Sequence, residues 1–81
     1  MKVRVQFYAQ LRDVSRVESV DVDLADGVNV SGLLQELYGK FPALRLHDKT
    51  ILVGAGVEFV DRSYPLKPGD EIAIMPPVQG G

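Results

Sequence analysis

Apolar side chains recur at every second position at the start of the chain, with polar side chains between them. A two-residue period places alternate side chains on opposite faces of a β-strand. The predicted inward residues of this strand are Val3, Val5, Phe7 and Ala9, and the outward residues are Lys2, Arg4, Gln6 and Tyr8. A second strand over 18–24 directs Val20, Val22 and Leu24 inward. We predict that the two strands pair as an antiparallel hairpin across the polar stretch 10–16.

The spacing of apolar residues changes to three and four between positions 30 and 41, which predicts a helix. Its apolar stripe consists of Val30, Leu33, Leu34, Leu37, Tyr38 and Phe41. Asn29 is placed to cap the first turn, and Pro42 disfavours helical geometry at the residue before it. Gly32 and Gly39 weaken the helix by up to ~1 kcal/mol each, so it must depend on packing against the strands. This is the only convincing helical pattern in the sequence.

The second half of the chain predicts three short strands. Residues 51–53 form a buried strand, and Gly54-Ala55-Gly56 turns it toward 57–60 in a meander. Lys67-Pro68-Gly69-Asp70 has the proline and glycine of a type II turn, and it precedes a last strand over 71–75. Pro76-Pro77 stops that strand.

The order of these elements defines the expected fold. Strand, strand, helix, strand, short strand and strand describe an α+β roll, in which one main helix packs across a mixed sheet of about five strands. This is the β-grasp, or ubiquitin-like, pattern. We expect residues 1–75 to form that domain and residues 76–81 to form an extended C-terminal tail.

Composition and charge exclude several classes of function. The 81 residues, 46% apolar and 25% charged, fit one small globular domain whose core is too small for a deep active site. The net charge of -2, without a basic run, argues against nucleic-acid binding. Apolar runs are shorter than the roughly 20 residues of a membrane span, and the N-terminus reads as a strand rather than a signal peptide. We therefore expect a cytoplasmic protein that is not an enzyme on its own.

Candidate ligand-binding residues are sparse. The chain has no cysteine, which excludes thiolate metal sites and a cysteine nucleophile. His47 and Asp48 lack a second nitrogen or sulfur donor, so we expect a surface loop and no metal site there. Gly54-Ala55-Gly56 is not followed by a helix and is read as a turn rather than a nucleotide loop. No cofactor is expected to bind to the chain itself.

The last six residues carry the clearest functional signal. They are Pro76, Pro77, Val78, Gln79, Gly80 and Gly81. An extended arm of this length reaches ~20 Å at roughly 3.3 Å per residue, and its two glycines lack the Cβ atoms that obstruct a narrow channel. Such an arm can carry the carboxylate of Gly81 into the active site of another protein. The alternative is a frayed end without function.

Two segments carry a resemblance to a known family, and the length of the chain and the order of its elements extend that similarity over the whole sequence. Leu66 to Gly81, with its Pro-Pro-Val-x-Gly-Gly ending, is similar to the end of the molybdopterin synthase small subunit, a sulfur carrier with the ubiquitin fold. The segment Phe7-Tyr8-Ala9-Gln10-Leu11-Arg12 resembles the first strand and turn of that family. Gly56 stands where many relatives have asparagine, and we expect a turn substitution there because both residues tolerate positive φ.

This resemblance implies a role for the tail. Gly81 would be adenylated by an enzyme related to the ubiquitin-activating enzymes, at the expense of ATP, and converted to a thiocarboxylate with sulfur from a sulfurtransferase. The tail residues 76–80 would then enter the large synthase subunit, where the sulfur passes to a pyranopterin precursor of the molybdenum cofactor. The carrier would form a heteromer with that subunit, whose side chains perform the catalysis.

Alternation of side chains also predicts a partner interface. Tyr8, Ala73 and Met75 are expected on the sheet face opposite the helix, where they are apolar in a position open to water. Phe59 joins them if its strand has the matching register, and otherwise belongs to the core. Matching positions in the resembled family pack against the activating enzyme and the large subunit, whereas scattered exposed apolar residues are also common in proteins without such a role.

Other readings of the same tail remain open. The chain could be a ubiquitin-like protein modifier, or a sulfur carrier for thiamin or tRNA thiolation, in which the activated glycine serves another acceptor. A plain binding module with an inert tail is the third alternative.

Overall fold

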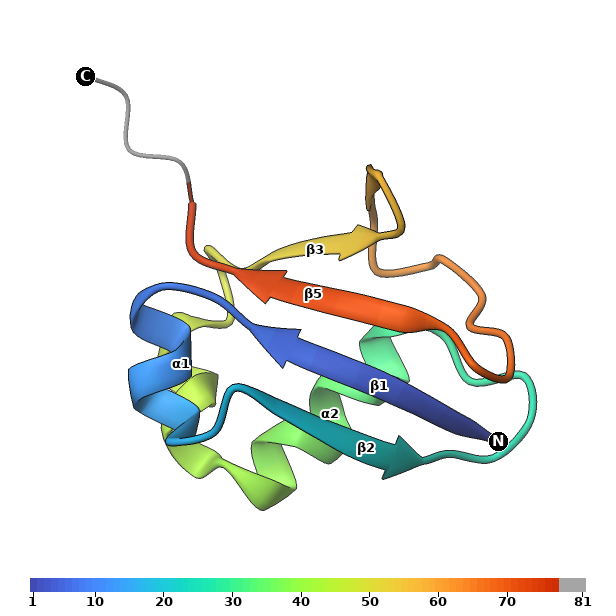
Figure 1. Cartoon of the computed structure of the whole chain (residues 1–81), viewed down its shortest axis with the longest axis horizontal. Helices are drawn as coiled ribbons and strands as arrows, with labels where there is room; N and C mark the ends of the chain where they lie inside the picture. The colour runs from blue at the N-terminus through green and yellow to red at the C-terminus, as the bar shows by residue number, and fades with distance from the viewer. Residues whose placement is uncertain (78–81) are drawn as a thin grey trace.

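A computed structural model describes residues 1–77 of the chain, and within them the strands form one mixed sheet in the order β2-β1-β5-β3-β4. Figure 1 shows β5 between β1 and β3, with β1 running parallel to it and β3 antiparallel. The strands are β1 (Lys2–Phe7), β2 (Ser19–Asp23), β3 (Leu52–Ala55), β4 (Glu58–Val60) and β5 (Glu71–Met75). The helices are α1 (Gln10–Ser15), α2 (Val30–Lys40) and the 3-10 helix η1 (Pro42–His47).

The predicted pairing of the first two strands is confirmed. β1 and β2 are antiparallel, with Val3 opposite Val22 and Val5 opposite Val20. Their connection is not a plain polar loop, because 10–15 fold into α1 around Leu11, which is fully buried. Ala9 is exposed, since β1 ends at Phe7 and Ala9 turns the chain into α1 with a φ of 53°.

Helix α2 forms as the apolar spacing predicts. The Asn29 side chain accepts a hydrogen bond from the Gly32 N–H at 3.0 Å, and the helix ends at Lys40, two residues before Pro42. The prediction that this is the only helix is wrong, because α1 and η1 are also present. Each of these is six residues long and depends on few buried side chains, among them Leu44 in η1, so neither shows a helical period in the sequence.

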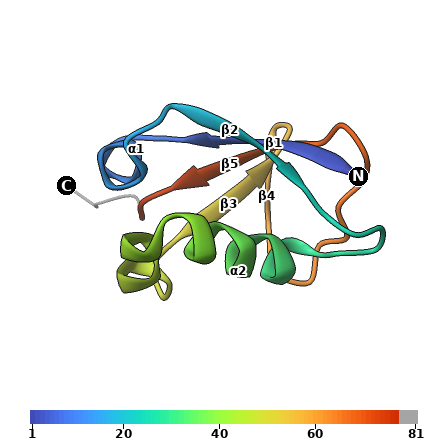
Figure 2. The ribbon, with the colours of Figure 1, turned by 90° about the horizontal axis from the view of Figure 1, so that it is seen from below.

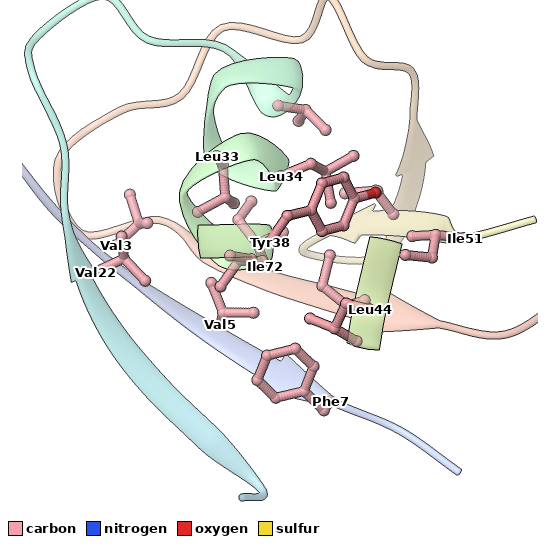
Figure 3. Packing of buried hydrophobic residues seen from close by; sticks show 14 of the residues in the cluster. Val3, Val5, Phe7, Val22, Leu33, Leu34, Tyr38, Leu44, Ile51 and Ile72 are labelled. Atoms are coloured by element: carbon pink, nitrogen blue, oxygen red, sulfur yellow. The ribbon is translucent and has the colours of Figure 1, made fainter. Parts of the chain in front are cut away.

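The core lies between the sheet and α2. Figure 2 shows α2 along one face of the sheet, and Figure 3 shows side chains of β1, β5 and α2 packed against one another. The rings of Phe7 and Phe41 meet edge to face with centroids 5.6 Å apart. The fully buried side chains include Val3, Val5, Leu33, Leu37, Ile72 and Ile74. The apolar faces that the sequence predicts for the strands and for α2 therefore pack against each other in one core.

The predicted turn from the third strand to the fourth is confirmed by the antiparallel pairing of β3 and β4, but it lies later in the sequence than predicted. Gly54 and Ala55 belong to β3, and the chain turns at Gly56, whose φ is 63°. β5 pairs with β3 and β1 instead of β4, which buries Ile72 and Ile74 at the centre of the sheet. The predicted type II turn before β5 is present, with a φ of 82° at Gly69.

Candidate functional site

A shallow depression of about 230 Å³ lies on the sheet face opposite α2. We call it the sheet groove, and its lining residues are Tyr8, Gly54, Gly56, Val57, Glu58, Phe59, Ala73 and Met75. The structure therefore brings together all four residues that alternation predicted for a partner interface.

Strand register explains why these residues share one face. Gly54 of β3 lies opposite Phe59 of β4 on one side and opposite Ala73 of β5 on the other. Residues directly opposite in neighbouring strands point to the same face of a sheet. Phe59 is accordingly 68% exposed and outside the core, which decides between the two alternatives for it.

The sequence did not predict four of the groove residues, which are Gly54, Gly56, Val57 and Glu58. A Cβ atom on Gly54 would lie 3.2 Å from Cε of Met75, so the absence of a side chain keeps the floor of the groove low. Val57 follows the turn and is fully exposed at the rim. The available signal was the glycine that follows Leu52 and Val53, because glycine within a strand marks a close approach.

The tail begins beside the groove. Leu52 lies opposite Met75, and the Tyr8 N–H donates to the carbonyl of Ile74 at 3.0 Å, which fixes the end of β5. Pro76 and Pro77 follow directly and are half-buried. The other predicted tail residues, Val78, Gln79, Gly80 and Gly81, lie outside the described residues. A partner that covers the groove thus reaches the residues from which the tail continues.

A polar cluster on the α2 side of the molecule was not predicted from the sequence. Asp48 Oδ1 accepts hydrogen bonds from Tyr38 Oη at 2.5 Å and from Arg62 Nη1 at 2.8 Å. The bonds from Arg62 and then Tyr38 lower the pKa of Asp48 below its usual 3.8. Burial, followed by the bond to Asp48, raises the pKa of Tyr38 to about 12. Asp48 is therefore charged and Tyr38 protonated at neutral pH, and together with Arg62 they join α2 to two loops.

Loss of the charge on Asp48 is expected to destabilise the fold in a pH-dependent way. A carboxylate whose pKa is lower in the folded state contributes stability above its unfolded pKa, and this is lost as the pH falls through the folded value. Asp48→Asn should therefore lower the melting temperature at pH 7, and the difference from wild type should narrow below about pH 4. Thermal unfolding between pH 7 and pH 3 measures it, with exposed Asp13→Asn as control. A pH-independent difference would contradict this account.

Among residues 1–77, no group of three or more His, Cys, Asp or Glu side chains is placed to hold a metal ion. His47 is the last residue of η1 instead of part of a plain loop, and Asp48 is engaged by Arg62. In the same part of the chain, no helix is long and apolar enough to cross a membrane.

Comparisons with known proteins agree on the family and the fold. Residues 5–81 match the ThiS family. The molybdopterin synthase sulfur carrier subunit of Chlamydomonas reinhardtii is 35% identical over 83 residues, with both chains covered completely. The crystal structure of SAMP1, small archaeal modifier protein 1, from Haloferax volcanii superposes with a TM-score of 0.86 at 27% identity, again over both whole chains. A chain from the complex of subunits 1 and 2 of the Helicobacter pylori molybdopterin-converting factor has the same fold, with a TM-score of 0.71, 23% identity and complete coverage of both chains.

Proposed function

We propose that this chain, which belongs to the ThiS family, is the sulfur carrier subunit of a molybdopterin synthase. The observation that carries the proposal is the 35% identity to a carrier subunit of that name over the full length of both chains. The chain is a small, non-catalytic subunit of a sulfur-transferring enzyme, and its β-grasp domain presents a tail to larger partners.

The chemistry that we propose takes place at the carboxylate of Gly81. A carboxylate is a poor electrophile, because its charge is delocalised and oxide is a poor leaving group. A partner enzyme therefore joins it to the α-phosphate of ATP, which releases pyrophosphate and leaves an acyl-adenylate. Hydrosulfide, delivered through a sulfurtransferase, then attacks the acyl carbon and displaces AMP. The product is a thiocarboxylate, which holds sulfur on a chain that has no cysteine.

The tail is the proposed means of delivery. Pro76 and Pro77 cannot donate ladder hydrogen bonds, so they end β5. We propose that Val78, Gln79 and Gly80 connect them to the reacting carboxylate of Gly81. In the large synthase subunit the thiocarboxylate donates its sulfur to a pyranopterin precursor in the synthesis of the molybdenum cofactor. The side chains that catalyse the transfer belong to the large subunit, and we place the process in the cytoplasm.

The sheet groove is the proposed docking surface for the large subunit and for the adenylating enzyme. It combines apolar walls at Tyr8, Phe59 and Met75 with a floor of Gly54 and Ala73, and it borders the start of the tail. Apolar side chains that are exposed together, beside a functional segment, are typical of a protein interface. In the Helicobacter pylori structure a chain of this fold forms a complex with a second subunit, which supports a heteromeric arrangement.

Reconstitution from purified components tests the proposal. The chain is incubated with an adenylating enzyme, ATP and a sulfide source, and intact-mass spectrometry should show one oxygen replaced by sulfur at the C-terminus. Addition of a large subunit and the pterin precursor should then yield the dithiolene product. A thiocarboxylate that no large subunit accepts would contradict the assignment to molybdopterin synthesis.

The likeness to SAMP1 favours one second function, that of a protein modifier. In that case the activated Gly81 is transferred to lysine amines rather than to sulfur. The same adenylation step precedes both outcomes, so they separate only at the acceptor. Mass spectrometry of tryptic digests from cells distinguishes them, because modification leaves the C-terminal residues of the chain attached to lysines of other proteins.

A further inference from the structure

A second depression, of about 300 Å³, lies on the opposite side of the molecule from the sheet groove. It is bounded by the second half of α2 and by residues 45–50, which are the last residues of η1 and the start of the connection to β3. We call it the basic corner and define it by Gln35, Tyr38, Arg45, Leu46, Asp48, Lys49 and Thr50. It belongs neither to the groove nor to the tail.

The basic corner has a local positive charge in a molecule whose net charge is -2. Its charged lining residues are Arg45, Lys49 and Asp48. Asp48 is neutralised by its ion pair with Arg62 at 2.8 Å. Within residues 1–77, neither Arg45 nor Lys49 forms an ion pair. Two cations therefore remain to attract negative charge on a partner.

The corner is organised before any partner arrives. The Arg45 guanidinium lies 5.2 Å from the centroid of the Tyr38 ring, a cation–π contact that positions it. Tyr38 is itself fixed by its hydrogen bond to Asp48. Leu46, between the two cations in sequence, is 87% exposed and offers an apolar contact beside the charges. Prior ordering of this kind reduces the entropy lost on binding.

The corner lies at the same end of the sheet as the start of the tail. Residues 45–50 precede β3, and Leu52 at the beginning of β3 lies opposite Met75 at the end of β5. Figure 1 shows the end of β5 close to the segment that leads into β3, as the pairing of Leu52 with Met75 requires. A protein that takes up the residues after Met75 therefore approaches this end and has the corner within reach.

We propose that the basic corner binds an acidic segment of the large subunit that receives the tail. The segment supplies Asp or Glu side chains to Arg45 and Lys49 and an apolar side chain to Leu46. This inference rests on the proposed function, and it adds a contact on the α2 side to the docking of the sheet groove. Charged contacts at such a rim mainly raise the association rate and set orientation.

Binding of the whole chain to the purified large subunit tests the proposal at low and high salt. The variant R45Q/K49Q should bind about 5–10-fold more weakly at low ionic strength, chiefly through slower association, and the difference should shrink at about 0.5 M salt. The matched control is K2Q/K67Q, which removes the same charge at the far end of the sheet. The two lysines lie near each other there, because the Gly69 N–H donates a hydrogen bond to the Lys2 carbonyl. The control should stay within about twofold of wild type.

Carbodiimide cross-linking gives a second, direct readout. It joins an amine to a carboxylate in contact with it, so Lys49 should become linked to an Asp or Glu of the large subunit. Lys49→Gln alone is tested as well, because it leaves the Tyr38 and Arg45 contact intact. Circular dichroism confirms that each variant is folded.

The possible outcomes separate the inference from its premise. If both double variants lose the same affinity for the large subunit, the effect comes from net charge and not from the corner. If R45Q/K49Q binds with unchanged affinity, the corner is not part of the interface. Either result overturns the inference while the carrier function stands. A wild-type chain that binds no large subunit overturns both.

Discussion

Removal of Gly80 and Gly81 is expected to abolish sulfur transfer while the domain stays folded. The proposed chemistry needs a carboxylate at the end of an arm that fits a narrow channel, and the deletion leaves that carboxylate two residues short. Among residues 1–77 the core is formed by side chains between Val3 and Ile74, and a glycine has no side chain to add to it. Intact-mass spectrometry after incubation with the adenylating enzyme, ATP and sulfide should show no thiocarboxylate. The melting temperature should match that of wild type.

A glycine elsewhere in the chain provides the control. Gly39 lies in α2, and a Cβ atom there would have no atom within 4 Å apart from its chain neighbours and the backbone of its own helix. Gly39→Ala should keep full transfer and stabilise the helix by up to ~1 kcal/mol, because alanine loses less backbone entropy on folding. If the deletion variant keeps full transfer activity, the chemistry does not need the Gly-Gly ending, and both hypotheses that depend on Gly81, carrier and modifier, are wrong.

Most of the fold could be predicted because its signals are local and repeated. The alternation in β1 and β2 and the stripe along α2 each extend over five or more residues, and the cap at Asn29 marks a boundary. The short elements could not be predicted in this way. α1 depends on the burial of Leu11 by distant parts of the chain, and β3 continues through Gly54 because Ala73 and Phe59 lie opposite it.

The residues of the candidate site likewise differ in whether a local sequence pattern predicts them. Tyr8, Ala73 and Met75 follow from alternation within single strands, and the structure brings them together as that alternation requires. Phe59 needed the register of β4, which is set by the turn at Gly56 and not by any pattern within three residues. The basic corner combines α2 with the end of η1 and the residues that follow it, and only the tertiary structure shows that Arg45 contacts Tyr38.

A negative charge in the sheet groove is expected to disrupt docking with little effect on the fold. Met75→Asp places a carboxylate beside Gly54, where a partner would have to remove it from water without a compensating bond. A penalty of about 2–3 kcal/mol corresponds to roughly 30–150-fold weaker binding. Tyr8→Asp should act in the same direction at the opposite wall. Calorimetric titration with the large subunit and with the adenylating enzyme measures both.

The control places the same charge on another surface. Val17 is 38% exposed between α1 and β2 and does not line the groove, so Val17→Asp should bind as wild type does. Thermal unfolding of all three variants separates weak docking from a damaged fold, since Met75 is half-buried. If Met75→Asp and Tyr8→Asp fold and bind with unchanged affinity, partners do not use the groove, and delivery of the tail would depend on contacts elsewhere. Weakened binding to one partner alone would mean that only that partner uses it.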